Sequence, residues 1–582
     1  MLKDCLEVFT KIPEQTRERM IIDGYIPVDG TYILLCPKGD SFEIKDSIDI
    51  KLDKKKGEIE GKSNSNFNNI CFYDYNSKLV EMNKPIDKNK IIHSNNYLSF
   101  FVKKDSLSNG KLTNEIIDNY YSILENPYLK YKELVDKKIY ESIENEIGKV
   151  NIERLEKIKS WIKENIFKLD EEFTKGKGYL KIFFEYSEDE YKNEGKRYFI
   201  PNIYNSNKFN KEIGKKIYGV PNDNMGLNSK KPYLENKSRK FKVPYLIDNS
   251  EVLLQKQFFD YLLNFATLGK LNIIINENDK EKIRGYKNDE LSKHDYDGIF
   301  LRLKKGKEVE IHDYDIITGF KTKLPKKLHF KNIIGLDLES KNVSFKNYQD
   351  IIFIEDFQKI LNDVFYSKLL INNYFTEPKD ISTNDSCLKN NLLLSRESIF
   401  NYIHKGSNNG VFNVLNKISL NLIKGDINNG YAVKASHKLN LRWSIMEFEE
   451  GIDMAEILNK TIECVRKKIN VDSYKAIETD DEYYFSVGQI VSYFLSKYKG
   501  KNKPLSLGKP FINAKSNEII RDNLRKMFNK YSYDPSINSK RFKNLYVLVN
   551  GYIPEGKVDE DMIIAGFLSN NLIYESSKEE SK

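Results

Sequence analysis

The order of apolar and polar residues divides the chain into a mixed first part and a helical second part. Thr31–Cys36 and Ile48–Lys51 are short β-branched runs bounded by the turn-forming stretches PKGD and KKKG, which predicts strands. Long Glu/Lys-rich segments between Asn114 and Leu169 predict helices. Gly178–Pro201 predicts a hairpin of two aromatic strands around an acidic turn.

The middle of the chain mixes both kinds of element. A helix is predicted around Glu251–Thr267, and the runs KLNIIIN and DGIFLRL predict strands. Polar turn residues gather in Glu377–Asn390, and no strand pattern follows them. A chain of 582 residues is too long for one core. We therefore predict an α+β protein, with a mixed α/β region over residues 1–376 and a helical bundle over 377–582.

Two C-terminal segments have clear helical spacing. In YYFSVGQIVSYFLSKY the apolar residues recur at i, i+3, i+4, i+7 and i+8. In NEIIRDNLRKMFNKY one face is apolar, so this helix is expected to bury that face and present cations on the other. The apolar positions of the two segments are Val487, Ile490, Val491, Phe494 and Leu495, then Ile520, Leu524, Met527, Phe528 and Tyr531, and the cations are Arg521, Arg525, Lys526 and Lys530.

The positive charge is concentrated in two windows. The net charge of +9 is modest, but residues 203–246 hold ten Lys/Arg against three Asp/Glu and residues 499–543 hold twelve against three. Together these windows exceed the excess of the whole chain, so the remainder is slightly acidic. Two separate basic regions indicate two contacts with a polyanion. A lysine-rich composition alone would instead leave these cations solvated.

The cysteine content and the apolar runs indicate a cytoplasmic protein. The five cysteines are scattered and never form CxxC, which argues for a reducing compartment and against a disulfide framework or a cysteine zinc site. The N-terminal residues have no signal-peptide pattern, and runs such as Ile351–Ile354 are too short to span a bilayer. We expect no membrane association.

The stretch GLNSKKPYLENKSRK, Gly226–Lys240, has neither helical nor strand periodicity and carries five cations against one acid. Such a loop offers amides to base edges and cations to phosphates. The alternative is a solvated loop. Its candidate contact residues are Asn228, Lys230, Lys231, Arg239 and Lys240.

Two further basic segments are candidates. In Lys90–Leu107, amides and lysines flank the aromatic group Tyr97, Phe100 and Phe101, which suits a groove or single-strand contact. The alternative is a strand with Asn at its turn and aromatics in the core. The C-terminal window is interpreted as a track for backbone phosphates, with an ordinary exposed helix face as the alternative. The candidates are Asn95, Asn96, Lys103 and Lys104, then Arg521, Arg525, Lys526, Arg541 and Lys543.

The motif HDYD occurs twice, at His294–Asp297 and His312–Asp315. Paired His and Asp ligate metals in phosphohydrolases, so a metal-dependent phosphohydrolase or nuclease is the alternative function. A pair of polar turns is the more economical interpretation of so short a motif. No Walker, GxSxG, HExxH or GxGxxG pattern is present, and we expect no catalytic site, cofactor or metal.

Four stretches resemble a known family. NNYLSFFVKK, GLNSKKPYLENKSRK, YYFSVGQIVSYFLSK and AGFLSNNLIYE, in this order between Leu34 and Tyr574, resemble the large subunit of type I-B CRISPR Cascade complexes, the Csh family. The resemblance implies a non-catalytic subunit that binds guide RNA and reads the protospacer-adjacent motif in duplex DNA through its N-terminal domain. It also implies a helical C-terminal domain along the displaced or target strand, other Cascade subunits as partners, and recruitment of a separate helicase–nuclease. Sequence specificity would then come from guide pairing.

The resemblance assigns roles to the candidate residues. The Gly226–Lys240 candidates would contact duplex DNA or the guide handle, with the Lys90–Leu107 candidates as second choice, and the C-terminal cations would contact strand backbone. Some relatives carry a cysteine-rich zinc element, but this chain has no matching cysteines. A third hypothesis is that the protein is a generic nucleic-acid-binding scaffold.

Subtype I-B systems can also make a small subunit from an internal start in the same gene. Met446 or Met454 would open a helical tail of roughly 130 residues, a reasonable size for a separate bundle. Alternatively, both are ordinary helix methionines.

Overall fold

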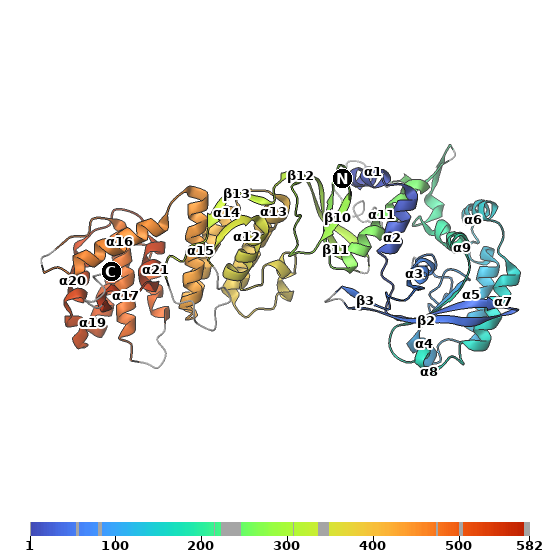
Figure 1. The fold of residues 1–582 in the computed structure, drawn as a ribbon, viewed down its shortest axis with the longest axis horizontal. Helices are drawn as coiled ribbons and strands as arrows, with labels where there is room; N and C mark the ends of the chain where they lie inside the picture. The colour runs from blue at the N-terminus through green and yellow to red at the C-terminus, as the bar shows by residue number, and fades with distance from the viewer. Residues whose placement is uncertain are drawn as a thin grey trace. The chain divides into compact units, whose positions relative to one another are not determined.

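The computed structural model describes residues 2–53, 57–78, 84–214, 216–222, 246–306, 308–335, 348–472, 475–499 and 505–575. The chain divides into two compact units. The N-terminal unit comprises Met1–Lys287 and Gly298–Ile316, and the C-terminal unit comprises Asn288–Asp297 and Ile317–Lys582. Sheets and helices mix in the first unit and helices dominate the second (Figure 1), so the predicted α+β class is confirmed.

A five-stranded sheet in the order β3-β2-β1-β5-β4 forms the first core of the N-terminal unit. β1 pairs with β5 in parallel, and the other neighbours are antiparallel. Apolar side chains of β1 and β5 are buried because helices cover this sheet. The strands are β1 (Gly30–Lys38), β2 (Ser41–Asp53), β3 (Glu58–Glu60), β4 (Ser99–Lys103) and β5 (Tyr179–Phe184).

The helices around this sheet supply the rest of the core and one buried ion pair. Lys181 on β5 donates to Asp74 at 2.6 Å, and Asp74 also accepts from the hydroxyl of Tyr25 at 2.9 Å. Both charged groups are almost fully buried, so each charge is compensated mainly by the other. The helices of this part are α3 (Phe67–Tyr75), α4 (Lys104–Ser108), α5 (Asn114–Glu125), α6 (Leu134–Ile147), α7 (Ile152–Asn165), α8 (Glu171–Thr174) and α9 (Glu188–Phe199).

The predicted hairpin over Gly178–Pro201 is wrong in its second half. β5 is followed by α9, whose start is held by a capping box between Ser187 and Glu190. The Ser187 side chain accepts from the backbone N–H of Glu190, and the Glu190 carboxylate accepts from that of Ser187. Ser-x-x-Glu is a helix-start signal, which outweighs the aromatic content that suggested a strand.

A second core in the N-terminal unit lies between helices and a four-stranded sheet in the order β10-β9-β11-β12. A small sheet, β6-β7-β8, completes the unit. The elements are α1 (Leu2–Thr10), α2 (Glu14–Asp23), α11 (Asn249–Thr267), β6 (Lys211–Ile213), β7 (Lys216–Gly219), β8 (Ile247–Asp248), β9 (Asn272–Ile275), β10 (Ile283–Tyr286), β11 (Tyr296–Lys305) and β12 (Val309–Phe320).

The C-terminal unit begins earlier than the predicted boundary at 376/377. The strands β13 and β14 pair with each other, and the backbone N–H groups of Ile333 and Ile334 donate to Asn440 in the helical part. These contacts join the segment after residue 317 to the bundle. The elements are β13 (Lys323–His329), β14 (Asp350–Phe353), α12 (Ile354–Ile360), α13 (Ser386–Lys405), α14 (Val411–Asn428), α15 (Ala432–Glu450), α16 (Met454–Ile469), α17 (Asp480–Ser496), α18 (Lys509–Ile512), α19 (Asn517–Tyr531), α20 (Lys540–Gly551) and α21 (Glu560–Leu568).

Short turns of helix link these elements. They are η1 (Pro127–Leu129), η2 (Ile200–Asn202), η3 (Asn207–Phe209), η5 (Leu361–Phe365), η6 (Ile371–Asn373), η7 (Pro378–Asp380), η8 (Leu505–Gly508), η9 (Pro535–Asn538) and η10 (Leu572–Tyr574). No helix in the described part of the chain combines the length and apolar composition needed to cross a bilayer.

The closest helix contact in the bundle joins α17 and α21 through two buried glycines. A Cβ at Gly488 would overlap the carbonyl oxygen of Ile563 and lie 2.6 Å from the nitrogen of Phe567. A Cβ at Gly566 would overlap the carbonyl oxygen of Phe485. The two backbones therefore touch directly, and no larger residue fits at either position.

Gln489, next to one of these glycines, ties the end of α21 to α17. Its amide donates to the carbonyl of Gly566 at 2.7 Å, and its side-chain oxygen accepts from the backbone N–H of Leu572 at 2.8 Å. Asn571 donates back to the carbonyl of Gln489 at 2.8 Å. These buried hydrogen bonds satisfy backbone groups left open where α21 ends.

We expect Gly488→Ala to lower the free energy of unfolding of the C-terminal unit by at least about 2 kcal/mol, because the overlap outweighs the better helix propensity of Ala. Trp161 and Trp443 lie in different units and are the only tryptophans. In a Trp161→Phe background, the fluorescence of buried Trp443 reports urea unfolding of this unit. Ser492→Ala on the same helix is the control and should change stability by less than about 0.5 kcal/mol. Equal stability of Gly488→Ala and the control would contradict the direct backbone contact.

Asp559 makes the bundle sensitive to pH. Its carboxylate accepts from the N–H of Met562 at 2.9 Å, and burial raises its pKa to about 6, with Asp561 and Asp481 adding to the rise. Because folding raises this pKa above the unfolded value of about 3.9, the stabilisation by protonated Asp559 is complete below about pH 4. It is lost as the pH rises through 6.

Asp559→Asn is therefore expected to be more stable than the wild type at pH 8, by about 1–2 kcal/mol after allowance for partial exposure. Asparagine caps a helix as well as aspartate does, so the two proteins should be equally stable at pH 4. Urea unfolding of the Trp161→Phe protein, with and without Asp559→Asn, measures the difference at both pH values. If the difference in stability between the two proteins were the same at pH 4 and pH 8, the titration of Asp559 would not be the cause of the pH dependence.

Candidate nucleic-acid interface

The first group of predicted contact residues lies outside the described residues. Asn228, Lys230, Lys231, Arg239 and Lys240 all belong to the Gly226–Lys240 stretch, of which the structure describes nothing. Their assignment to a nucleic-acid contact stays a prediction.

The predicted amide contacts in the second group are buried in the N-terminal unit. Asn95 donates to the carbonyl of Lys78 at 2.8 Å, and Asn96 donates to that of Tyr191 at 3.1 Å. Asn96 also accepts from the N–H of Leu98 at 3.0 Å. Both residues are at most 3% exposed. Their amides hold the turn before β4, so a direct contact with nucleic acid does not fit this conformation.

The two lysines that follow have opposite environments. Lys104 is buried, and its ammonium donates to the hydroxyl of Thr31 at 2.8 Å and to the carbonyl of Lys175 at 3.1 Å. Lys103 is exposed. The aromatic rings Tyr97, Phe100 and Phe101 pack in the core. Strand packing, the alternative weighed from the sequence, therefore describes this segment, and Lys103 alone remains at the surface.

Two of the C-terminal candidates are engaged within the bundle. Arg521 donates to the carbonyl of Tyr552, and its guanidinium partly offsets the rise that burial causes in the pKa of the Tyr483 phenol. Arg541 donates to the side-chain oxygen of Asn470 at 2.6 Å and to the carbonyl of Glu575. These arginines fix helix ends, and the structural role accounts for both.

The remaining C-terminal candidates face solvent. Arg525, Lys526 and Lys543 are exposed, and only Arg525 has an acidic neighbour, Asp522 at 3.9 Å, among the ion pairs of the described residues. We call these three residues the α19–α20 face. Long exposed cationic side chains without acidic partners can neutralise the phosphates of a nucleic-acid backbone.

Aromatic packing joins the two helices of the α19–α20 face. Phe528 on α19 stacks on Tyr546 on α20, with ring centroids 4.7 Å apart. Burial raises the pKa of the Tyr546 phenol, and the nearby Arg525 guanidinium partly offsets this rise. Lys543 lies one turn before Tyr546 on α20. Arg525 and Lys543 therefore border this aromatic contact at the surface of a packed core, and Lys526 is exposed on the same helix, α19, as Arg525.

The first HDYD stabilises a chain reversal. Asp295 accepts from the N–H and the hydroxyl of Thr322 at 2.9 and 3.0 Å, and the backbone N–H of Gly319 donates to Asp297. In the second HDYD, Asp313 and Asp315 accept from the N–H groups of the residues that follow them. The two copies belong to different units. In the part of the chain that the structure describes, no three His, Cys, Asp or Glu side chains gather to hold a metal.

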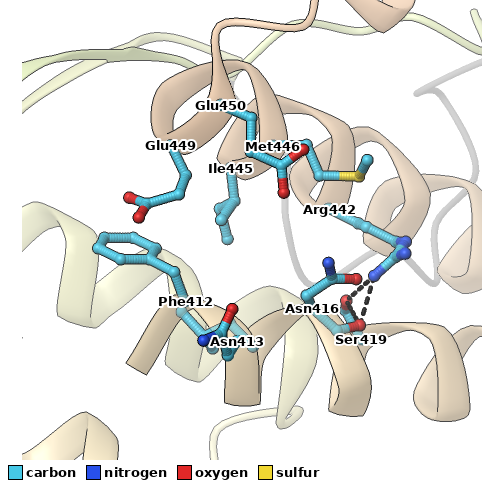
Figure 2. A pocket seen from close by; sticks show the side chains of 10 residues that line it. Phe412, Asn413, Asn416, Ser419, Arg442, Ile445, Met446, Glu449 and Glu450 are labelled. Atoms are coloured by element: carbon cyan, nitrogen blue, oxygen red, sulfur yellow. Dashed lines mark hydrogen bonds between the residues drawn. The ribbon is translucent and has the colours of Figure 1, made fainter. Parts of the chain in front are cut away.

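A small cavity between α14 and α15 is closed to a ligand larger than water. Figure 2 shows Arg442 directed away from its acidic rim and toward α14. Arg442 donates to the hydroxyl of Ser419 at 2.9 Å and pairs with both oxygens of Asp561 at 2.7 and 2.8 Å. The cavity volume of about 20 Å³ admits one water molecule. Arg442 thus ties α15 to α14 and α21.

The sequence interpretation missed four residues at the end of α17: Lys497, Lys499, Tyr533 and Tyr574. Both tyrosines are more than half exposed, and each has a lysine ammonium over its ring. Tyr533 and Tyr574 lie outside any apolar helical stripe, in segments rich in Lys, Asn and Ser. Tyr574 has no apolar residue at i±3 or i±4, which is a signal that could have marked it, whereas Tyr533 has Ile537 at i+4 and carries no such signal.

The α19–α20 face gives a measurable prediction. If it binds a nucleic-acid backbone, Lys526→Ala with Lys543→Ala should reduce the slope of log affinity against log salt by about 1.4–1.8, since each phosphate contact contributes 0.7–0.9. The matched control is Lys460→Ala with Lys467→Ala on α16. Those lysines are exposed but paired with Glu456 and Glu463. Fluorescence anisotropy at several salt concentrations measures the slope for both double variants. Equal slopes would exclude the α19–α20 face as a phosphate-binding surface.

Comparisons with protein-family models, with curated proteins and with solved structures gave no match to this chain.

Proposed function

We propose that the protein is the large, non-catalytic subunit of a type I-B CRISPR Cascade complex that acts in antiviral defence. It binds guide RNA and target duplex, stabilises the R-loop, and helps to recruit a separate helicase–nuclease. Sequence specificity is supplied by the guide, and the protein contributes backbone contacts and recognition of a short adjacent motif.

The observation that supports this proposal best is the α19–α20 face. Lys526 and Lys543 are exposed on a packed helical bundle and have no acidic partner among the described residues. Such cations contact phosphates without reading bases, which suits a subunit that follows a strand whose sequence the guide has already selected. The HDYD carboxylates are used in turns, which does not support the metal-dependent nuclease.

Family resemblance supports the proposal through other residues. YYFSVGQIVSYFLSK covers most of α17, and AGFLSNNLIYE runs from the end of α21 to Glu575. They contain Gly488 and Gly566, the two glycines of the direct helix contact. The shared motif is thus a packing motif of the bundle, and it bears on the fold of the C-terminal unit more than on the binding of a ligand.

The two methionines proposed as internal starts differ in their place in the fold. Met454 is the first residue of α16, whose N-terminus is capped by Asp453 through the N–H groups of Ala455 and Glu456. Met446 lies within α15. A product starting at Met446 would keep the cap, whereas one starting at Met454 would lose it, at a cost of about 1 kcal/mol. We therefore favour Met446 as the start of a small subunit.

A pull-down of the tagged full-length protein from its native cells tests the assignment. We expect short repeat-derived guide RNA, other complex subunits, and a fragment of roughly 130 residues. Mass spectrometry gives the first residue of the fragment. Met446→Leu, encoded by a codon that does not initiate translation, should abolish the fragment, because the internal start is lost. The full-length protein should still fold, because Leu has nearly the same side-chain volume as Met.

Met527→Leu, a change in α19 away from both candidate starts, is the control and should leave the fragment unchanged. Recovery of the protein alone, without RNA, would contradict the Cascade assignment. Recovery with guide RNA but without any fragment would contradict only the internal start.

A further inference from the structure

Two tyrosines expose their rings at the end of α17. Tyr533 is 60% exposed and Tyr574 is 53% exposed. The hydroxyl of Tyr574 is hydrogen-bonded to that of Ser496 at 2.5 Å, and its ring lies 5.3 Å from the ring of buried Tyr493. Tyr574 is thus held in place while half of its surface stays in contact with solvent.

A lysine covers one side of each ring. The ammonium of Lys499 lies 4.9 Å from the ring centroid of Tyr533, and that of Lys497 lies 5.2 Å from the centroid of Tyr574. A cation–π contact at an exposed site is weakly attractive and biases the orientation of each ring. Each ring therefore combines exposed π surface with a nearby positive charge.

The two rings belong to one strip of surface. The hydroxyl of Tyr493, whose ring lies beside that of Tyr574, donates to the carbonyl of Ser536 at 2.9 Å, three residues after Tyr533. Hydrogen bonds from Ser536 have the larger lowering effect on the pKa of Asp534, the residue next to Tyr533, and the charges of Lys497 and Lys499 both lower it further. Lys497 and Lys499 are two residues apart, a separation of at most about 7 Å along the backbone. We call Lys497, Lys499, Tyr533 and Tyr574 the tyrosine strip.

From this geometry we propose that the tyrosine strip binds single-stranded polynucleotide by stacking bases on Tyr533 and Tyr574 while Lys497 and Lys499 contact the adjacent phosphates. The inference rests on the proposed nucleic-acid function and adds to it a site of a different kind. The α19–α20 face offers charge alone, whereas the strip offers rings whose partners are unpaired bases.

The strip should distinguish single strands from duplexes. In a duplex the base faces are covered by their neighbours, so an exposed tyrosine gains little from meeting one. In a single strand the bases can leave the stack and place a face against the ring. Stacking of this kind tolerates any sequence, because every base has a π face. The strip therefore contributes affinity without sequence preference.

Fluorescence anisotropy with the full-length protein tests this inference on three labelled probes: dT20, rU20 and a 20-base-pair duplex. Tyr533→Leu with Tyr574→Leu should weaken binding of dT20 by about 5-fold or more for each ring, and duplex binding should change by less than about 2-fold. Comparison of dT20 with rU20 shows whether DNA or RNA is preferred. Tyr533→Phe with Tyr574→Phe keeps both rings and should retain the affinity for dT20.

Tyr431 supplies a matched control in the same unit. It is 50% exposed, and the ammonium of Lys434 lies 4.6 Å from its ring centroid, but it lies at the start of α15. Tyr431→Leu should leave dT20 binding unchanged. Trp443 fluorescence in the Trp161→Phe background verifies that each variant is folded.

The outcomes separate this inference from the proposed function. A wild-type protein that binds none of the three probes would overturn both. If the wild type binds dT20 but the double Leu variant binds it equally well, or loses dT20 and duplex binding to the same extent, the tyrosine strip is not a stacking site and the proposed function stands. Selective loss of single-strand binding, restored by Phe, establishes the strip.

Discussion

The helical bundle depends on the direct contact between α17 and α21. At Gly488 and Gly566 the two backbones meet with no side chain between them, so neither helix can move without opening a void. The surrounding core residues, among them Phe485 and Ile563, pack against a separation that the glycines set. Residues of α16, α19 and α20 belong to the same core, so these helices pack around the α17–α21 pair.

The sequence predicted the elements well where one physical signal dominated. Helical spacing identified α17 and α19, and runs of β-branched residues identified β1, β9 and β11. The hairpin prediction failed because Ser187 and Glu190 start a helix that the aromatic residues concealed. The spacing of apolar residues therefore located helices and strands. Where one segment fitted both a helix and a strand, local hydrogen bonds determined which of the two formed.

Candidate site residues were harder to predict, because side-chain exposure depends on packing between distant segments. Asn95, Asn96 and Lys104 have the chemistry of nucleic-acid contacts, but their partners are Lys78, Tyr191 and Thr31, which no local pattern reveals. Helical spacing puts Lys526 opposite an apolar stripe, and its side chain is exposed, while the contact of Lys526 and Lys543 with a nucleic-acid backbone stays a prediction. The exposed tyrosines were missed because aromatic residues are usually part of a core.

Neither unit is one continuous piece of chain, and this constrains the order of folding during synthesis. The N-terminal unit needs residues up to Ile316 to complete the sheet that contains β9 and β11, whereas Asn288–Asp297, made earlier, belongs to the C-terminal unit. Tyr296 in that segment donates to the carbonyl of His404, more than a hundred residues later. Asn288–Asp297 therefore cannot complete its contacts until α13 has left the ribosome. A pause in translation between these two segments would prolong an incompletely folded state.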